Sequence, residues 1–110
     1  MKHEIIEKPD ARVVVFSGEI DLESSPIARE ILIKSFRNTK KVIVDLSEVS
    51  YIDSSGVASL VEAFQSAKSK GLKFALAQVS ETPMRVLKLA RLDQVFVIYA
   101  TLDEATAALA

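Results

Sequence analysis

The feature that most constrains the fold is a continuous apolar run, KKVIVDL, at residues 40–46 of the 110-residue chain. A strand with one face in water alternates apolar and polar residues, so this run predicts a strand buried on both faces, as in a parallel sheet covered by helices. The run LKFALAQV at residues 72–79 has the same character. Because 49% of the residues are apolar, the chain can bury such a sheet in one core. The sequence therefore predicts an α/β protein.

The remaining segments place these two runs in an alternation of strands and helices. Short runs rich in β-branched residues predict strands, and apolar residues three and four positions apart predict helices. The expected strands are 3–8, 12–18, 40–46, 72–79 and 95–100, and the expected helices are 24–36, 54–70, 81–92 and 101–110. In this β-β-α-β-α-β-α-β-α order, right-handed crossovers predict a mainly parallel mixed sheet, to which the opening hairpin adds an antiparallel edge strand. No linker or repeat divides the sequence, which predicts one domain over residues 1–110.

Several helix ends are marked by residues that can satisfy free backbone groups. Ser25 is the expected N-cap of the first helix, and Thr82 is the expected N-cap of the third. Thr101 and Glu104 have the spacing of a capping box at the start of the last helix. Gly71 is expected to end the second helix, because glycine readily adopts the left-handed conformation found there.

Composition and charge exclude several classes of function. The formal net charge is −1, without the basic excess of nucleic-acid-binding or polybasic membrane-surface proteins. The chain has no cysteine, and its single histidine, His3, lies at the N-terminus, so neither a thiolate zinc site nor a Ser–His–Asp triad is expected. No phosphate-binding glycine motif, signal peptide or apolar run of about 20 residues occurs. We therefore expect a cytoplasmic binding protein rather than an enzyme, with no cofactor, no direct nucleic-acid partner and no membrane span.

Carboxylates are the one group of side chains that could still support chemistry. Glu19, Asp21 and Glu23 alternate after the second strand, and Asp45 lies near the end of the third, a set that could bind Mg²⁺ as in a phospho-aspartate receiver. That interpretation is disfavoured because no lysine follows the last strand to hold an acyl phosphate. Solvent-exposed loop acids explain the pattern more simply.

Two adjacent serines occur in the stretch Asp53-Ser54-Ser55-Gly56, directly before the second helix. Winding that helix at about 100° per residue gathers its apolar residues on one face and places Ser55 and Ser59 on the opposite face, toward water. Ser54 lies nearer the buried edge and is the expected N-cap, with its hydroxyl accepting a hydrogen bond from a free N–H of the first turn. The winding thus predicts a structural Ser54 and an exposed Ser55.

An exposed hydroxyl in the first turn of a helix is well placed to carry a phosphate. Free N–H groups and the positive end of the helix dipole would stabilise the added charge, so the fold should stay intact. The phosphate would instead repel an acidic partner surface. Ser and Asp are also common capping residues, so the same stretch can equally be a polar strand-to-helix connection. From the chemistry of these residues alone, both interpretations remain open.

The segment VIVDLSEVSYIDSSGVASLVEAFQSAKSKG resembles the signature of STAS-domain proteins of the bacterial anti-sigma factor antagonist type. The stretch SGEIDLESSPIARE resembles the G-E-[IL]-D-x-x-x-[AS]-P motif of the same family, and residues 71–105 resemble its C-terminal third. The resemblance spans nearly the whole chain. It implies the STAS fold, with the order of strands and helices predicted above.

The resemblance also implies a function, that of an anti-anti-sigma factor. Unphosphorylated members bind an anti-sigma factor, often a serine protein kinase, and so release a sigma factor. Phosphorylation of the second serine of the motif, here Ser55, blocks binding, and a serine phosphatase reverses the block. The implied partner-binding residues belong to the end of the second strand with its loop and to the start of the helix that follows Asp53. They are Gly18, Glu19, Asp21, Asp53, Ser54, Ser55, Gly56 and Ser59.

Other members of the family imply an alternative function. Some are constitutive subunits of transport ATPases for outer-membrane lipid maintenance, and others belong to stressosome-like signalling assemblies. The lipid-transport members often have D-T-G-G at this place, whereas this chain has Ser55 where they have glycine. Partner switching controlled by phosphorylation is therefore the leading expectation, and a constitutive subunit is the alternative.

Overall fold

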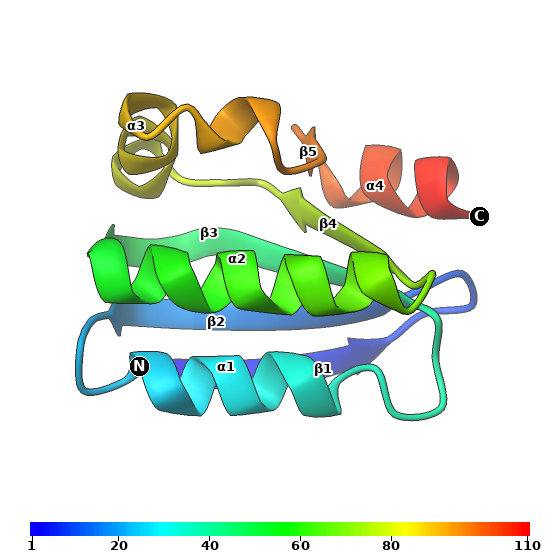
Figure 1. Ribbon diagram of the computed structural model, residues 1–110. Coiled ribbons are helices and arrows are strands. Elements are labelled where there is room, and N and C mark those ends of the chain that lie inside the picture. Colours follow the sequence, from blue (N-terminus) through cyan, green and yellow to red (C-terminus); the bar gives the residue numbers. More distant parts are fainter.

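The structure is a computed structural model that describes residues 1–110. Its elements follow the chain as β1 (Lys2–Glu7), β2 (Arg12–Ile20), α1 (Ser25–Lys34), β3 (Lys41–Ile52), α2 (Ser54–Ser69), β4 (Lys73–Ala77), α3 (Glu81–Leu89), the short 3₁₀ helix η1 (Leu92–Gln94), β5 (Ile98–Tyr99) and α4 (Leu102–Leu109). The predicted order of strands and α-helices is confirmed (Figure 1).

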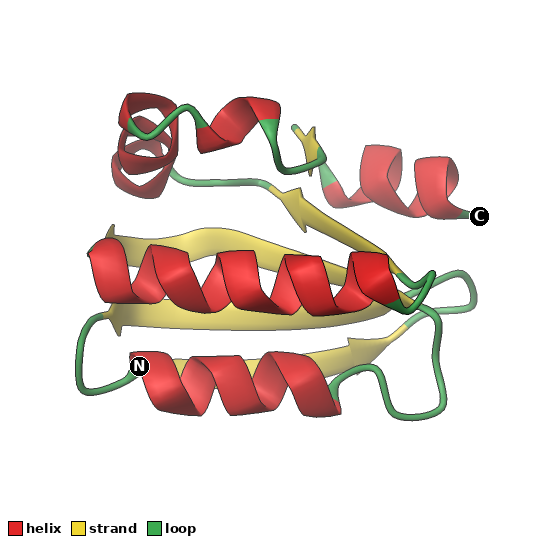
Figure 2. Cartoon of the chain, in the orientation of Figure 1, coloured by secondary structure: helices red, strands yellow, loops and turns green.

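The five strands form one mixed sheet in the order β1-β2-β3-β4-β5. β1 runs antiparallel to β2, and every other neighbouring pair is parallel, as the sequence predicts. Because β2 and β3 run the same way, they end at the same edge of the sheet. The loop after β2 and the start of α2 therefore lie together at one end of the molecule (Figure 2).

Helices cover both faces of the sheet, which explains the continuous apolar runs in β3 and β4. α1 and α2 lie side by side on one face (Figure 1), over a core that includes Phe16, Leu32 and Leu60. α4 covers the other face, where Ile43 and Leu109 belong to a second apolar cluster. None of the helices combines the length and apolar character that a membrane span needs.

Two strands differ in length from the sequence-based prediction. β3 continues six residues past residue 46, because Val49 and Ile52 are buried and pair with β2 across two shifts in register. The first of these shifts lies between Val15 and Ser17 and the second between Gly18 and Glu19. At the opposite edge of the sheet, β5 has only two residues instead of the expected 95–100.

Two predicted helix caps are also wrong by one or two positions. α1 has Ser24 as its N-cap instead of Ser25, and α3 has Ser80 instead of Thr82. The Ser80 hydroxyl bonds instead to carbonyl oxygens of the long strand β3, a tertiary contact that sequence spacing does not reveal. Thr101 is confirmed as a cap, since its hydroxyl accepts a hydrogen bond from the Glu104 N–H at 3.1 Å. Gly71 follows α2 with a φ of +69°, as expected of a glycine that ends a helix.

Candidate functional site

The predicted site lies where β2 and β3 end and α2 begins. The two strand ends are tied together by a hydrogen bond from the Asp53 N–H to the Ile20 carbonyl, at 3.2 Å. The loop after Ile20 leads directly into α1, and the Ser25 N–H donates to the Asp21 carbonyl at 2.8 Å. These bonds bring Asp21 and Asp53, which are 32 residues apart in sequence, to the same end of the sheet.

Asp53, and not Ser54, is the N-cap of α2. With Ser54 as the cap, the first helical residue would be Ser55, but Ser54 itself is helical, so the cap position falls on the extended residue before it. The Asp53 Oδ1 accepts a hydrogen bond from the Gly56 N–H at 3.0 Å. Ser54 is exposed, and the expectation that it caps the helix from the buried edge is wrong.

Ser55 is half-buried, and its hydroxyl is engaged. It donates a hydrogen bond to the Asp53 Oδ1 at 2.5 Å, so the cap carboxylate holds both a backbone and a side-chain donor of the first turn. The Ser55 hydroxyl, followed by the Gly56 N–H, holds the pKa of Asp53 below its usual value because both bonds favour the ionised form. The phosphorylation candidate is therefore oriented by the residue that starts its helix.

Ser59 does not face water. It is 5% exposed, and its hydroxyl lies 2.9 Å from the Ser25 carbonyl oxygen and 3.2 Å from that of Ser55. Ser59 faces away from the sheet, but α2 also packs along its flank against α1, and this contact buries the side chain. An ion pair between Arg29 of α1 and Glu62 of α2 joins the same two helices nearer the surface.

Gly56 is needed because α2 approaches the strand ends too closely for a side chain. A Cβ at this position would lie 2.6 Å from the Ile52 Cγ1 and 2.7 Å from the Ile20 carbonyl oxygen. Both distances are far below van der Waals contact, and one involves backbone that cannot move aside. The close approach that glycine permits is thus internal to the fold, and it fixes the height of the first turn of α2 above the sheet.

The loop after β2 is held by its own polar side chains. The Asp21 carboxylate accepts hydrogen bonds from the N–H groups of Glu23 and Ser24, at 3.1 and 3.0 Å. The backbone and then the side chain of Ser24 lower the pKa of Asp21, while the charge of Asp53 opposes this shift. That opposition means that the two carboxylates lie within electrostatic reach of each other.

Gly18 shapes the strand that leads into this loop. Its φ is +88°, and it stands beside the second register shift of β2, where the chain needs a conformation that other residues rarely adopt. The Ser50 hydroxyl of β3 donates a hydrogen bond to the Gly18 carbonyl oxygen at 3.3 Å, which stabilises the backbone beside this register shift. Glu19, the next residue, is exposed at the edge of the site.

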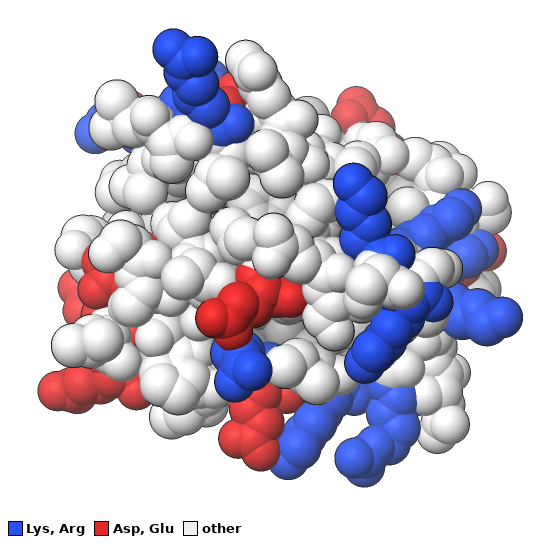
Figure 3. Space-filling model, in the orientation of Figure 1, with Lys and Arg blue, Asp and Glu red and all other residues white.

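Acidic side chains dominate this end of the molecule, but they do not assemble a metal site. In the space-filling view, Asp and Glu gather at the end where β2 and β3 finish, and Lys and Arg gather at the opposite end and over α3 (Figure 3). No three His, Asp or Glu side chains are grouped as metal ligands. Asp45 is buried near the middle of β3, where its carboxylate accepts hydrogen bonds from the Ser47 N–H at 2.8 Å and the Gln78 amide at 3.0 Å.

The fold agrees with that of known proteins. The family model described as STAS domain matches residues 2–105. This chain belongs to the STAS domain family. The resemblance seen in the sequence is thereby confirmed.

Relatives of this STAS protein include named regulators. The anti-sigma-B factor antagonist of Bacillus subtilis is 32% identical over 87 residues, which cover 79% of this chain and 80% of that protein. The crystal structure of an anti-sigma factor antagonist from Mycobacterium paratuberculosis has a TM-score of 0.85 at 25% identity, over 98% of this chain and 92% of that one. SpoIIAA of Bacillus, solved in its phosphorylated form, shares the fold with a TM-score of 0.74 at 19% identity, over 99% of this chain and 100% of that one.

The structure adds apolar residues to the site that sequence reasoning missed. Leu22 is 74% exposed in the loop between Asp21 and Glu23, and Tyr51 is 45% exposed two residues before Asp53. Exposed large apolar side chains beside a polar site are typical of surfaces that bind a partner. A signal was present in the sequence, since Leu22 stands alone among the acids of an otherwise polar loop.

Proposed function

We propose that this STAS domain is an anti-sigma factor antagonist whose binding is controlled by phosphorylation of Ser55. In its unphosphorylated form it binds an anti-sigma factor that is also a serine protein kinase, and a sigma factor is released. The kinase then phosphorylates Ser55 and binding is lost, until a serine phosphatase removes the phosphate. The protein acts in the cytoplasm as a binding partner and not as a catalyst. The names of its relatives support the antagonist role.

The observation that carries this proposal is the position of the Ser55 hydroxyl. It stands in the first turn of a 16-residue helix, is half-exposed, and is oriented by a 2.5 Å hydrogen bond to the Asp53 carboxylate. The N-terminus of such a helix stabilises a phosphate through its free N–H groups and its dipole. An oriented, reachable hydroxyl at this place suits a kinase, which must bring the attacking oxygen into line with the phosphate of its nucleotide.

A phosphate on Ser55 would change this end of the molecule in a specific way. The hydroxyl would lose the proton that it donates to Asp53, and a group of charge about −1.5 to −2 would stand beside that carboxylate. The two anions would then compete for the N–H groups that open α2. We expect Asp53 to lose part of its hold on the Gly56 N–H, so that the surface changes in shape as well as in charge.

The proposed docking surface is the acidic end together with its exposed apolar residues. Glu19, Asp21 and Asp53 provide charge for a basic partner surface, and Leu22 and Tyr51 provide apolar contact. A second group of the expected residues supports the surface from beneath, namely Gly18, Gly56 and Ser59. Ser54 and Ser55 complete it at the helix start.

Kinase mapping would test the proposal. The protein is incubated with ATP and the anti-sigma factor kinase of its own organism, and the modified residue is located by mass spectrometry. We expect one phosphate per chain, on Ser55. Ser54→Ala is the matched control and should be modified normally, whereas Ser55→Ala should not be modified.

Binding to the same kinase separates the proposal from a constitutive role in a transport ATPase or a stressosome-like assembly. Ser55→Asp should abolish binding, and Ser54→Asp should weaken it less because the Ser54 side chain makes no hydrogen bond to Asp53. Nuclear magnetic resonance spectra of the backbone amides would verify that both variants are folded. A stable native complex that is indifferent to Ser55→Asp would overturn the switch and favour the constitutive subunit.

A further inference from the structure

A second surface lies at the other end of α2, where β3 and β4 begin (Figure 1). A groove of about 580 Å³ opens there between the last turns of α2 and the segment that leads into β5. Phe64 of α2 and Phe74 of β4 line it, and Val95 and Val97 line it from the segment before β5. An adjoining hollow of about 400 Å³ shares Phe64 and Val95, so the apolar surface continues along α2.

The floor of this groove is a packed aromatic cluster, but its wall is open to water. The rings of Phe64 and Phe96 meet edge to face at 5.3 Å, and those of Phe64 and Phe74 lie 6.0 Å apart. Val95 and Val97, by contrast, are 49% and 44% exposed. β5 is only two residues long, so no regular strand orders the segment that carries them. Nothing in the chain covers this apolar wall.

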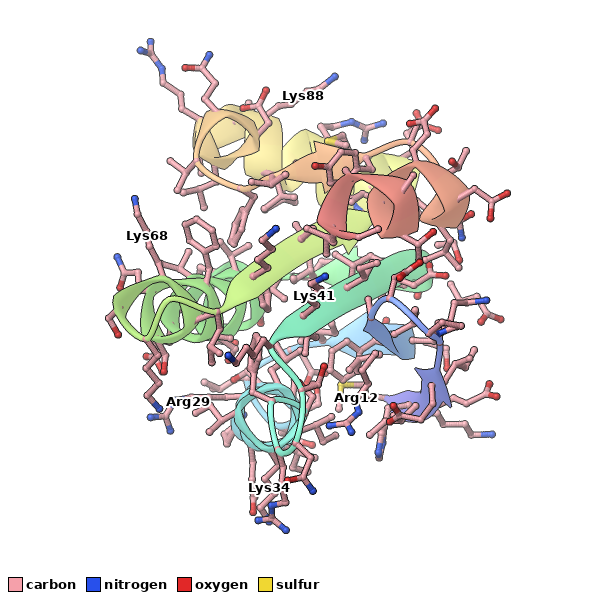
Figure 4. The ribbon with its side chains drawn as sticks, turned by 90° about the vertical axis from the view of Figure 1, so that its right-hand side faces the viewer. Arg12, Arg29, Lys34, Lys41, Lys68 and Lys88 are labelled. Carbon is pink, nitrogen blue, oxygen red and sulfur yellow. The ribbon has the colours of Figure 1, made fainter.

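The charge at the groove has one sign. Lys68 and Lys73 are part of its lining, and neither hollow is lined by an acidic residue. Lys73 is paired in register with Lys41 on the neighbouring strand, so two positively charged residues stand opposite each other in the sheet. None of the ion pairs of the protein involves these three lysines. Figure 4 looks at this end and labels Lys41 and Lys68.

We propose that this groove binds a single-chain anionic amphiphile, such as a long-chain fatty acid. The acyl chain lies against the aromatic floor and the two exposed valines, and the anionic head lies beside Lys68 and Lys73. The volume falls in the range of about 300–1,000 Å³ typical of small-molecule sites. The apolar lining fits an acyl chain, and the unpaired lysines fit a head of opposite charge.

The hollow shape of the site favours a single bound molecule over a membrane surface as its ligand. Peripheral membrane binding requires apolar side chains that project beyond the charged residues, whereas here they line a hollow beside the lysines. The site is therefore expected to take a monomeric ligand. It lies at the opposite end of α2 from Ser55 and does not depend on phosphorylation.

The test uses the full chain and dodecanoate below its critical micelle concentration. Amide shifts in nuclear magnetic resonance spectra should saturate with dodecanoate and centre on residues 64–74 and 95–97. Dodecanol has the same chain without the charge and should bind at least about tenfold more weakly, which is the factor expected for loss of charged hydrogen bonds. Equal binding of dodecanol, or sedimentation with phosphatidylglycerol vesicles in the absence of dodecanoate binding, would overturn the proposal.

Substitutions inside and outside the groove test whether the ligand binds there. Lys68→Gln combined with Lys73→Gln should weaken dodecanoate binding about tenfold, while Lys88→Gln on α3 should leave it unchanged. Val97→Asp should abolish binding, and Leu89→Asp, which changes an equally apolar and more exposed residue outside the groove, should not. If a double variant fails to fold, Lys68→Gln alone on the surface of α2 gives the same comparison. A result in which the control variants weaken binding as strongly would place the ligand elsewhere.

Discussion

The two ends of α2 carry opposite charge, and they differ in how that charge is held. At its start, Asp21 and Asp53 are each fixed by hydrogen bonds from the loop or the helix that they begin. Near its end, Lys68 and Lys73 make no ion pair, and Lys73 stands next to Lys41. The acidic end is thus part of the folded framework, whereas the basic end has charges that folding does not use.

The two ends of α2 also differ in how tightly they are packed. Around the start of α2, Gly56 and Ser59 allow the helix to lie close against the strand ends and against α1. Around its end, Gly71 has open space about it, and Val95 and Val97 remain half-exposed. A tightly packed end can present a hydroxyl such as that of Ser55 in one orientation, and a loosely packed end can admit a ligand.

The largest expected difference in stability comes from replacing a glycine with alanine at each end of α2. Gly56→Ala should lower the free energy of unfolding by about 3 kcal/mol, because its Cβ would collide with the Ile20 carbonyl and the Ile52 side chain. Gly71→Ala meets no neighbour and should cost only about 1 kcal/mol, through its positive φ. Urea denaturation of both variants measures the difference. Equal losses would mean that the start of α2 is not the tighter end.

A smaller effect is expected from removing a hydroxyl at each end. Ser59→Ala should lower the free energy of unfolding by about 1 kcal/mol, because it breaks the buried hydrogen bond from α2 to the Ser25 carbonyl of α1. Ser66 lies two turns further along the same helix and is only half-buried. Ser66→Ala should therefore leave the urea midpoint nearly unchanged, and a loss as large as that of Ser59→Ala would contradict the comparison.

The fold could be predicted because its main signals are local. The apolar run at residues 40–46 can be satisfied only by a sheet covered on both faces, and the strand–helix order then leaves few topologies. The extension of β3 to Ile52 could not be predicted, because it depends on register shifts beside Gly18 that involve a distant strand. The two-residue length of β5 likewise depends on a distant strand, since β5 pairs with β4 only at Ile98 and Tyr99.

The site was predicted in place but not in detail. The DSSG motif located the start of α2, yet the roles of its residues depended on a one-residue difference in where the helix begins. That shift made Asp53 the cap and left Ser54 exposed. Ser59 was misplaced because a helical wheel drawn for one partner surface cannot represent a second one, here α1. Tyr51 was missed because the exposure of a single apolar residue is a tertiary property, whereas Leu22 could have been found from its place among the acids of its loop.

Acid should weaken the start of α2 before it affects its end. The pKa of Asp53 is lowered below its ordinary value of 3.8, by Ser55 and then by Gly56, so its stabilising effect is fully present above that value. The effect is lost as pH falls through the lower pKa of the folded state. Asp53→Asn should therefore reduce the dependence of the urea midpoint on pH below about 4. Asp10→Asn, in the β1–β2 turn, is the control and should keep the acid dependence of the parent protein.

The smallest effect concerns the basic end, where removal of charge should help folding. Lys73→Gln relieves repulsion with Lys41 and should raise the free energy of unfolding by about 0.3 kcal/mol at low salt. The gain should vanish in about 1 M salt, where charges are screened beyond roughly 3 Å. Lys2 is paired in register with the uncharged Ser17, so Lys2→Gln is the control and should show no gain. If Lys73→Gln gains stability while it loses dodecanoate binding, Lys73 serves a ligand at a cost to the fold, and the contrast between the two ends of α2 is one of function as well as of packing.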